Sequence, residues 1–172
     1  RSGVGGDVDL DVDVHARAGR YGNCGRRCGH GRSCLRRNCG CRSVSGRCCL
    51  GLRILDNLST GYRSAVLGAP LVVGDTGDRA LVDATLAEHA VDTVMHFAAH
   101  TVVPESVSNP LKYYGNNTCA TRNLLECCDR AGVGQFVFSS TAAVYGTPAG
   151  GLAREDTPTS PINPYGLSKL MS

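Results

Sequence analysis

The sequence predicts an α/β fold, a Rossmann-like doubly wound parallel sheet, and three observations support this. From residue 52 onward, short apolar runs alternate with amphipathic stretches, the signature of repeated β-α units. The run VDTVMHFAA at 91–99 is largely apolar, as expected for a strand that is buried on both faces. Polar residues follow the predicted strands, at the end where such sheets bind ligands, namely Asp56, Asp75, His100, Thr101 and Ser139 to Thr141.

Four strands are predicted in chain order, each as a short apolar run that ends in, or is followed by, a polar or small residue. Because helical stretches separate them, right-handed crossovers should make the sheet mostly parallel. The predicted strands are LRIL at 52–55, PLVVGD at 70–75, VDTVMHFAA at 91–99 and QFVFSS at 135–140.

Two complete helices are predicted between these strands. The stretch 78–90 has apolar residues at helical spacing, and Asp78 lies near its start, where the helix dipole favours an anion. The stretch 109–132 begins with Asn109, a suitable N-cap, and stops at Gly132, a suitable C-terminal residue. We also expect the three cysteines of this stretch to behave as small buried hydrophobes.

The composition of residues 1–51 differs from that of the rest. Seven of the ten cysteines lie between Cys24 and Cys49, and residues 1–53 carry eleven Arg against four Asp, a balance of +7. Residues 54–172 carry five Arg and two Lys against eleven acidic residues, a balance of −4. The sequence therefore divides into an aberrant Cys/Arg/Gly-rich segment, residues 1–51, and a globular part, residues 52–172.

Two interpretations of residues 1–51 stay open. One is out-of-frame translation, since Cys, Arg and Gly codons become Val, Ala, Gly, Asp or Glu codons when they are read one base later. GRCCL is then compatible with a shifted VVVVL strand, and the true frame resumes near Leu52. We expect such a segment to lack a convincing core.

The other interpretation is a zinc or nucleic-acid module at 24–49. Ten Arg without an acidic residue between 14 and 53 would suit phosphates. The cysteine spacing shows no paired Cys-x-x-Cys pattern, so we expect neither a metal site nor nucleic-acid binding. If the segment did bind zinc, the candidate ligands would be Cys24, Cys28, His30, Cys34, Cys39 and Cys41.

No run of about 18 apolar residues occurs, and the first residues are polar, acidic and glycine-rich, unlike a secretory signal. We therefore expect a cytoplasmic protein without a membrane partner.

The pair Tyr165 and Lys169 in YGLSK stands at the spacing of one helical turn, which puts both side chains on one face. An ammonium close to a phenol favours the phenolate and lowers the phenol's pKa from about 10. A tyrosine tuned in this way can exchange a proton with a sugar or alcohol hydroxyl. The hydroxyls of Ser139, Ser140 and Thr141, at the end of a predicted strand, could hydrogen-bond the same oxygen.

The segments LDNLSTG, HFAAHTVVPESVSNPLKYYGNNTCATRNLLE, FVFSSTAAVYG and PINPYGLSKLM together resemble the extended short-chain dehydrogenase/reductase superfamily, and more narrowly the UDP-glucose 4-epimerases. The resemblance covers residues 54–172. It implies that Tyr165, Lys169 and Thr141 are catalytic. The related 4,6-dehydratases carry Asp-Glu directly after this threonine, whereas this chain has Ala142 and Ala143, so the resemblance implies epimerisation rather than loss of water.

The resemblance also implies NAD as cofactor. Asp56 takes the position of the acidic residue that holds the adenosine ribose, which favours NAD over NADP. The family often has Lys where this chain has Thr101, and the Gly-x-x-Gly-x-x-Gly turn expected before Asp56 is not found. The implied cofactor contacts are Asp56, Asn57, Thr60, Gly61, Asp75, Thr76, Phe97, Ala98, Ala99, Thr101, Asn116, Tyr165 and Lys169.

A UDP-sugar is the implied substrate, and the intact parent enzyme is implied to be a homodimer. Family members are nearly twice as long, and this chain starts at Arg1 and stops three residues after Lys169. We therefore expect a fragment that is inactive as it stands. We also expect that one turn of helix around Lys169 is too short to be stable without neighbours.

Overall fold

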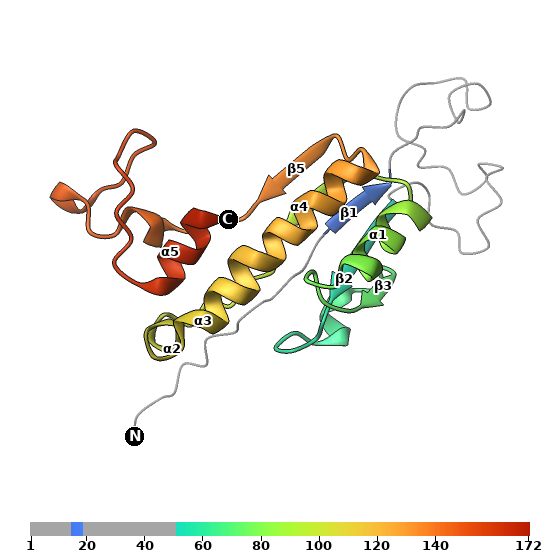
Figure 1. Cartoon of the computed structure of the whole chain (residues 1–172), viewed down its shortest axis with the longest axis horizontal. Coiled ribbons are helices and arrows are strands. Elements are labelled where there is room, and N and C mark those ends of the chain that lie inside the picture. Colours follow the sequence, from blue (N-terminus) through green and yellow to red (C-terminus); the bar gives the residue numbers. More distant parts are fainter. Residues whose placement is uncertain (1–14, 19–50) are drawn as a thin grey trace.

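The computed structural model describes residues 15–18 and 51–172, which form one five-stranded sheet with helices packed on it (Figure 1). The strand order across the sheet is β3-β2-β1-β4-β5. The strands are β1 (His15–Ala18), β2 (Gly51–Asp56), β3 (Leu71–Val73), β4 (Val91–His96) and β5 (Gln135–Phe138).

Four of the five strands run in one direction, which confirms the predicted parallel sheet. β2 pairs with β3 and β4 pairs with β5 in parallel, whereas β1 is antiparallel to both β2 and β4. The order is that of the Rossmann fold, in which the first strand also lies at the centre but runs parallel to its neighbours. β1 was not predicted. The other residues of 1–50 lie outside the described part, so neither interpretation of 1–51 is tested.

Helix α1 (Arg79–Glu88) begins where predicted. The Asp78 side chain caps it by accepting a hydrogen bond from the Leu81 amide at 3.1 Å. A short helix that was not predicted, α2 (Val103–Ser108), follows β4.

The predicted long helix is continuous but has three parts, α3 (Pro110–Tyr113), a π-helical segment (Tyr114–Cys119) and α4 (Ala120–Ala131). It starts at Asn109, whose side chain accepts from the Lys112 amide, and it ends at Gly132, which adopts the left-handed conformation with φ of 70°. The remaining helices are α5 (Pro164–Met171) and 3-10 segments at Arg63–Val66, Ala142–Tyr145 and Ala149–Gly151.

The core lies between the sheet and one layer formed by α1 and α4. Leu55 of β2 and Val94 of β4 pack against Val82 of α1 and Leu124 of α4. Cys127 and Cys128 belong to the same core, as predicted, and burial raises the pKa of the Cys128 thiol to about 11. Cys119 is exposed, so its predicted burial is wrong.

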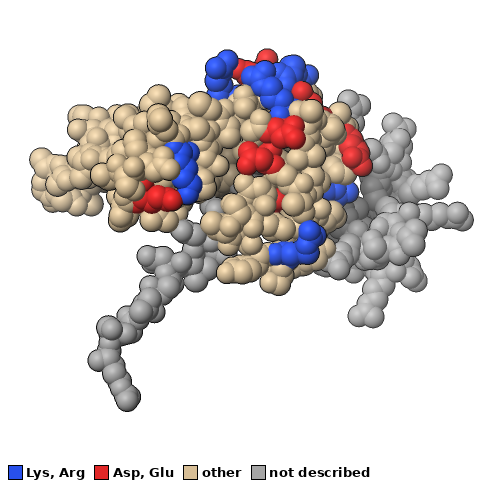
Figure 2. Space-filling model, turned by 60° about the horizontal axis from the view of Figure 1, so that its bottom comes forward, with Lys and Arg blue, Asp and Glu red and all other residues tan. Residues whose placement is uncertain are grey.

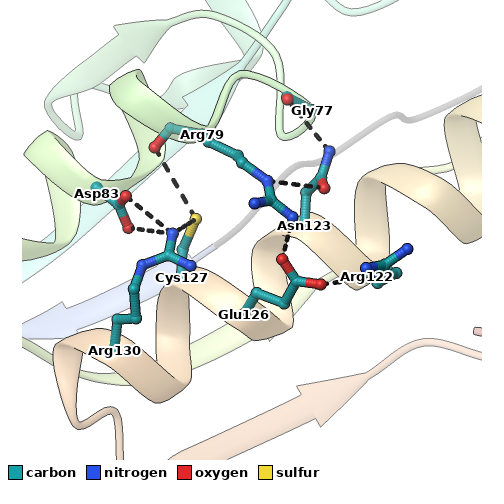
Figure 3. A network of polar contacts seen from close by, with 8 residues as sticks. All are labelled: Gly77, Arg79, Asp83, Arg122, Asn123, Glu126, Cys127 and Arg130. Atoms are coloured by element: carbon teal, nitrogen blue, oxygen red, sulfur yellow. Dashed lines mark hydrogen bonds and ion pairs between the residues drawn. The ribbon is translucent and has the colours of Figure 1, made fainter.

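Polar contacts at the surface also join α1 to α4 (Figure 3). Arg130 of α4 donates to both carboxylate oxygens of Asp83, at 3.0 and 2.9 Å, and this hydrogen bonding lowers the pKa of Asp83. Arg79 of α1 pairs with Glu126, which also accepts from Arg122 at 2.8 Å. Exposed pairs of this kind contribute little to stability individually.

Acidic and basic side chains adjoin one another on the face shown in Figure 2, rather than separating into patches of one sign. No helix between residues 51 and 172 is long and apolar enough to cross a membrane.

Candidate functional site

A small open cleft lies at the carboxyl ends of β2, β3 and β4. Six of the predicted cofactor residues line it, which are Asn57, Asp75, Thr76, Ala98, Ala99 and Asn116. Ser59 and Gly74 also line it and were not predicted, and His100, identified only as a polar residue at a strand end, completes the lining.

Hydrogen bonds between the loops after β2 and β3 shape this cleft. Asn57 donates from Nδ2 to Asp75 Oδ2 at 2.9 Å, and Asp75 Oδ1 accepts from the Gly77 amide at 2.7 Å. Asp56 lies buried at the end of β2, where its Oδ1 accepts from the Leu58 amide at 2.6 Å. That bond accompanies a left-handed backbone at Leu58, with φ of 56°. The bond between Asn57 and Asp75 joins the loop after β2 to the loop after β3.

Seven predicted cofactor residues do not line the cleft; two of them, Tyr165 and Lys169, lie on α5 and are described below. The other five are Asp56, Thr60, Gly61, Phe97 and Thr101. Of these five, Asp56 is buried, Thr60 is exposed, and the remaining three are half-buried.

The residues at the cleft have chemistry that suits the adenosine end of a dinucleotide. A carboxylate oxygen can accept more than one hydrogen bond, so Asp75 keeps capacity for hydroxyl donors besides its own contacts. Ala98 and Ala99 supply a small apolar surface against which a planar ring could lie.

The direction of β1 bears on the phosphate-binding side of this site. In a Rossmann domain the chain leaves the first strand at the carboxyl edge and forms the phosphate-binding turn there. Here Ala18, the last residue of β1, pairs with Gly51 and Val91, the first residues of β2 and β4. The chain therefore leaves β1 at the opposite edge of the sheet from the cleft.

Helix α5 carries the predicted catalytic pair. Asn163 caps it by accepting from the Gly166 amide at 2.8 Å. Tyr165 is half-buried, whereas Lys169 is only 4% exposed and has its Nζ 4.3 Å from the centre of the Phe138 ring at the end of β5. Thr141 caps the neighbouring 3-10 segment, accepting from the Ala143 amide at 3.2 Å. α5 packs directly on that segment.

Asn117, in the π-helical segment, joins the cleft to α5 and was missed by the sequence analysis. Its side chain accepts from the His100 amide at 2.7 Å and donates to the His100 carbonyl at 3.0 Å and to Ser168 Oγ at 2.9 Å. Thr118 donates to the Ser168 carbonyl at 3.0 Å. The α5 helix, eight residues long, therefore has neighbours that hold it in place.

His96, the last residue of β4, is buried against Thr121 of α4 and is neutral. Its Nε2 is 2.8 Å from Thr121 Oγ1, which itself donates to the Asn117 carbonyl, so Nε2 carries the proton. Burial, followed by the charge of Lys169, lowers the pKa of His96 to about 4.

Gly166 sets how closely α5 approaches the Thr141 segment. A Cβ at this position would lie 2.6 Å from the Ala143 carbonyl oxygen. We expect Gly166→Ala to destabilise the chain by about 1–3 kcal/mol through overpacking, measured by urea unfolding. Gly115→Ala is the control, because a Cβ there meets no atom within 4 Å. Equal stability of both variants would contradict the close contact.

Burial of Lys169 should make stability depend on pH. Desolvation lowers the pKa of Lys169 from 10.5 to about 8, so between these values the unfolded chain binds more protons than the folded one. Stability should rise with pH across this window, by up to roughly 3 kcal/mol. Lys169→Met should lack this rise when urea unfolding is measured at several pH values. Parallel curves for wild type and variant would refute the burial of a titrating lysine.

Comparisons with known proteins place the chain in a family. Residues 54–172 match the family model for GDP-mannose 4,6 dehydratase. The chain is 57% identical over 119 residues to the UDP-glucose 4-epimerase of Azospirillum brasilense, which covers 69% of this chain and 34% of that enzyme. It thus spans about a third of the length of the curated relatives it matches.

Solved structures give the same result. The UDP-glucose 4-epimerase from Brucella ovis, solved in complex with NAD, matches with a TM-score of 0.67 and 43% identity, over 69% of this chain and 37% of that one. A dTDP-glucose 4,6-dehydratase from Streptomyces venezuelae, solved with NAD bound, matches with a TM-score of 0.65 and 33% identity, over 69% and 38%. The chain therefore belongs to the GDP-mannose 4,6 dehydratase family, within which it resembles the UDP-glucose 4-epimerases.

Proposed function

We propose that residues 52–172 form the partial NAD-binding and catalytic domain of an enzyme that epimerises C4 of a UDP-hexose, interconverting UDP-glucose and UDP-galactose. The observation that carries the proposal is the placement of α5. It puts Tyr165 and Lys169 one turn apart and packs directly against the segment that begins at Thr141. The identity to UDP-glucose 4-epimerases supports the same reaction.

NAD would be held mainly at the cleft. Asp56 and Asp75 would accept hydroxyls of the adenosine half, and Ala98 and Ala99 would lie beneath it. Lys169 would reach the nicotinamide ribose from α5. When bound, NAD accepts the C4 hydride of the sugar and returns it. An acidic residue at position 56 repels a 2′-phosphate, which favours NAD over NADP.

The residues of this chain would move the proton. Tyr165 as phenolate takes the proton of the C4 hydroxyl and returns it after the 4-keto sugar has turned over. Lys169 lies one turn after Tyr165 on α5, and its ammonium faces the ring of Phe138. The hydroxyl of Thr141 donates to the C4 oxygen.

Two other functions compete with this one. Another NAD-dependent nucleotide-sugar epimerase or decarboxylase of the same superfamily would share this half of the site. Dehydration, in contrast, needs a proton donor and a base to remove water, and Ala142 and Ala143 supply neither.

The second competing function, zinc or nucleic-acid binding by residues 24–49, concerns a segment outside the described residues. Within the described part, no group of three His, Cys, Asp or Glu side chains could hold a metal ion.

The activity is proposed for a protein with the length of the relatives, which we take to be a homodimer. The 172-residue chain alone should be inactive. A hybrid enzyme supplies the missing length. In it, residues 54–172 of this chain replace the 119 aligned residues of the Azospirillum brasilense UDP-glucose 4-epimerase. It should convert UDP-galactose to UDP-glucose, and a correctly folded hybrid without this activity would refute the proposal.

A further inference from the structure

The side chain of Tyr113, the last residue of α3, is held by contacts of its hydroxyl with Val102 and Glu105. Tyr113 is fully buried, and its hydroxyl lies 2.6 Å from the Val102 carbonyl oxygen and 2.9 Å from Glu105 Oε2. Glu105 is in turn paired with Lys112, whose Nζ lies 2.6 Å from Oε1. The hydrogen bonds from Lys112 and Tyr113 lower the pKa of Glu105 and keep it a carboxylate. The phenol of Tyr113 is therefore fixed at its polar end.

The ring of Tyr113 contacts the two functional parts of the site. Its centroid lies 6.4 Å from that of Tyr165, with 79° between the ring planes, and 5.7 Å from that of His100. Edge-on aromatic pairs at such distances are attractive and sensitive to orientation. His100 lines the cleft, and its backbone is held on both sides by Asn117. A rotation of the Tyr113 ring would therefore be transmitted to Tyr165.

We propose that Tyr113 is a positioning residue for Tyr165, and that the contact of its hydroxyl with Glu105 and Val102 sets the plane of the Tyr165 ring. The inference rests on the proposed role of Tyr165 as the proton-transfer group. Tyr113 does not act on the substrate in this account. It fixes the direction from which the Tyr165 hydroxyl approaches the sugar, and an error of about 1 Å in such placement can cost 100-fold in rate.

The variant that tests this is Tyr113→Phe, which keeps the ring and removes only the anchored hydroxyl. In the hybrid enzyme we expect kcat to fall roughly 10- to 100-fold, with KM for UDP-galactose within about twofold of wild type. Tyr114→Phe removes the same group from the next residue and should leave kcat within about twofold. Glu105→Gln keeps an acceptor for the hydroxyl, so its kcat should lie between those of Tyr113→Phe and Tyr114→Phe.

Ring contacts in the 172-residue chain give a readout that does not depend on activity. With isotope-labelled aromatic residues, the nuclear Overhauser contacts between rings 113 and 165 should weaken in Tyr113→Phe and persist in Tyr114→Phe. Persisting contacts together with an unchanged kcat would overturn the positioning role alone. An inactive wild-type hybrid in which Tyr113→Phe still disturbs the Tyr165 ring would support the positioning and refute the proposed function instead.

Discussion

Replacement of Tyr165 by Phe should reduce epimerisation by the hybrid enzyme to less than a few per cent of the wild-type rate. Phe keeps the ring and its edge-on contact with Tyr113 but has no hydroxyl to exchange a proton with the C4 oxygen. Positioned acid–base groups typically contribute about 10²- to 10⁴-fold to rate. The loss should be in kcat, because the nucleotide-sugar and the cofactor are held mainly by other residues. Initial rates with UDP-galactose measure it.

Binding separates this effect from a folding defect. The Tyr165→Phe hybrid should bind UDP and NAD as the wild type does and should unfold at the same urea concentration. Tyr145→Phe, a change of the same size in the adjacent 3-10 segment, should retain most of the activity. Residual activity well above a few per cent in Tyr165→Phe would show that another group transfers the proton.

The second large effect concerns NAD affinity. We expect the isolated 172-residue chain to show no NAD binding at micromolar concentrations by calorimetry. The reason is the direction of β1, whose last residue, Ala18, lies at the edge of the sheet opposite to the cleft. Backbone amides at a helix N-terminus normally hold the pyrophosphate in this fold, and that contribution would be lost.

The hybrid enzyme is the matched comparison, because it keeps the relative's own residues before position 54 and carries the same cleft. It should bind NAD. Micromolar binding by the 172-residue chain would contradict the prediction and would imply that residues 1–53 build a working phosphate site.

Most of the sheet could be predicted from the sequence because hydrophobic runs report burial directly. β2 to β5 and α1 were expected near their observed positions, and Asp78 caps α1 as predicted. β1 could not be predicted, since a four-residue strand (HARA) has no periodicity to detect. α2 was missed for a similar reason, as six residues with proline in the first turn are shorter than two helical turns.

Within the site, sequence reasoning identified side chains of suitable chemistry but not the contacts that orient them. The helix at 109–132 was predicted from its end residues, which carry no information on its π-helical segment or on which side chains face inward. Asn117 faces inward with Tyr113 and Thr121, at ordinary helical spacing, and binds Ser168 and His100, whereas Cys119 lies at the surface. Two adjacent asparagines in a sequence do not reveal which one faces the core, so only Asn116 was predicted.

The fate of the hydrogen at C4 tests the central claim most directly. The hybrid enzyme is incubated with NAD and with UDP-glucose that carries deuterium at C4. The sugar nucleotides are then separated, and their masses are measured by mass spectrometry. The account predicts UDP-galactose that retains the deuterium, because the same hydride leaves C4 and returns to it while Tyr165 exchanges only the hydroxyl proton. Loss of deuterium from the product, or a product lighter by one water, would contradict it.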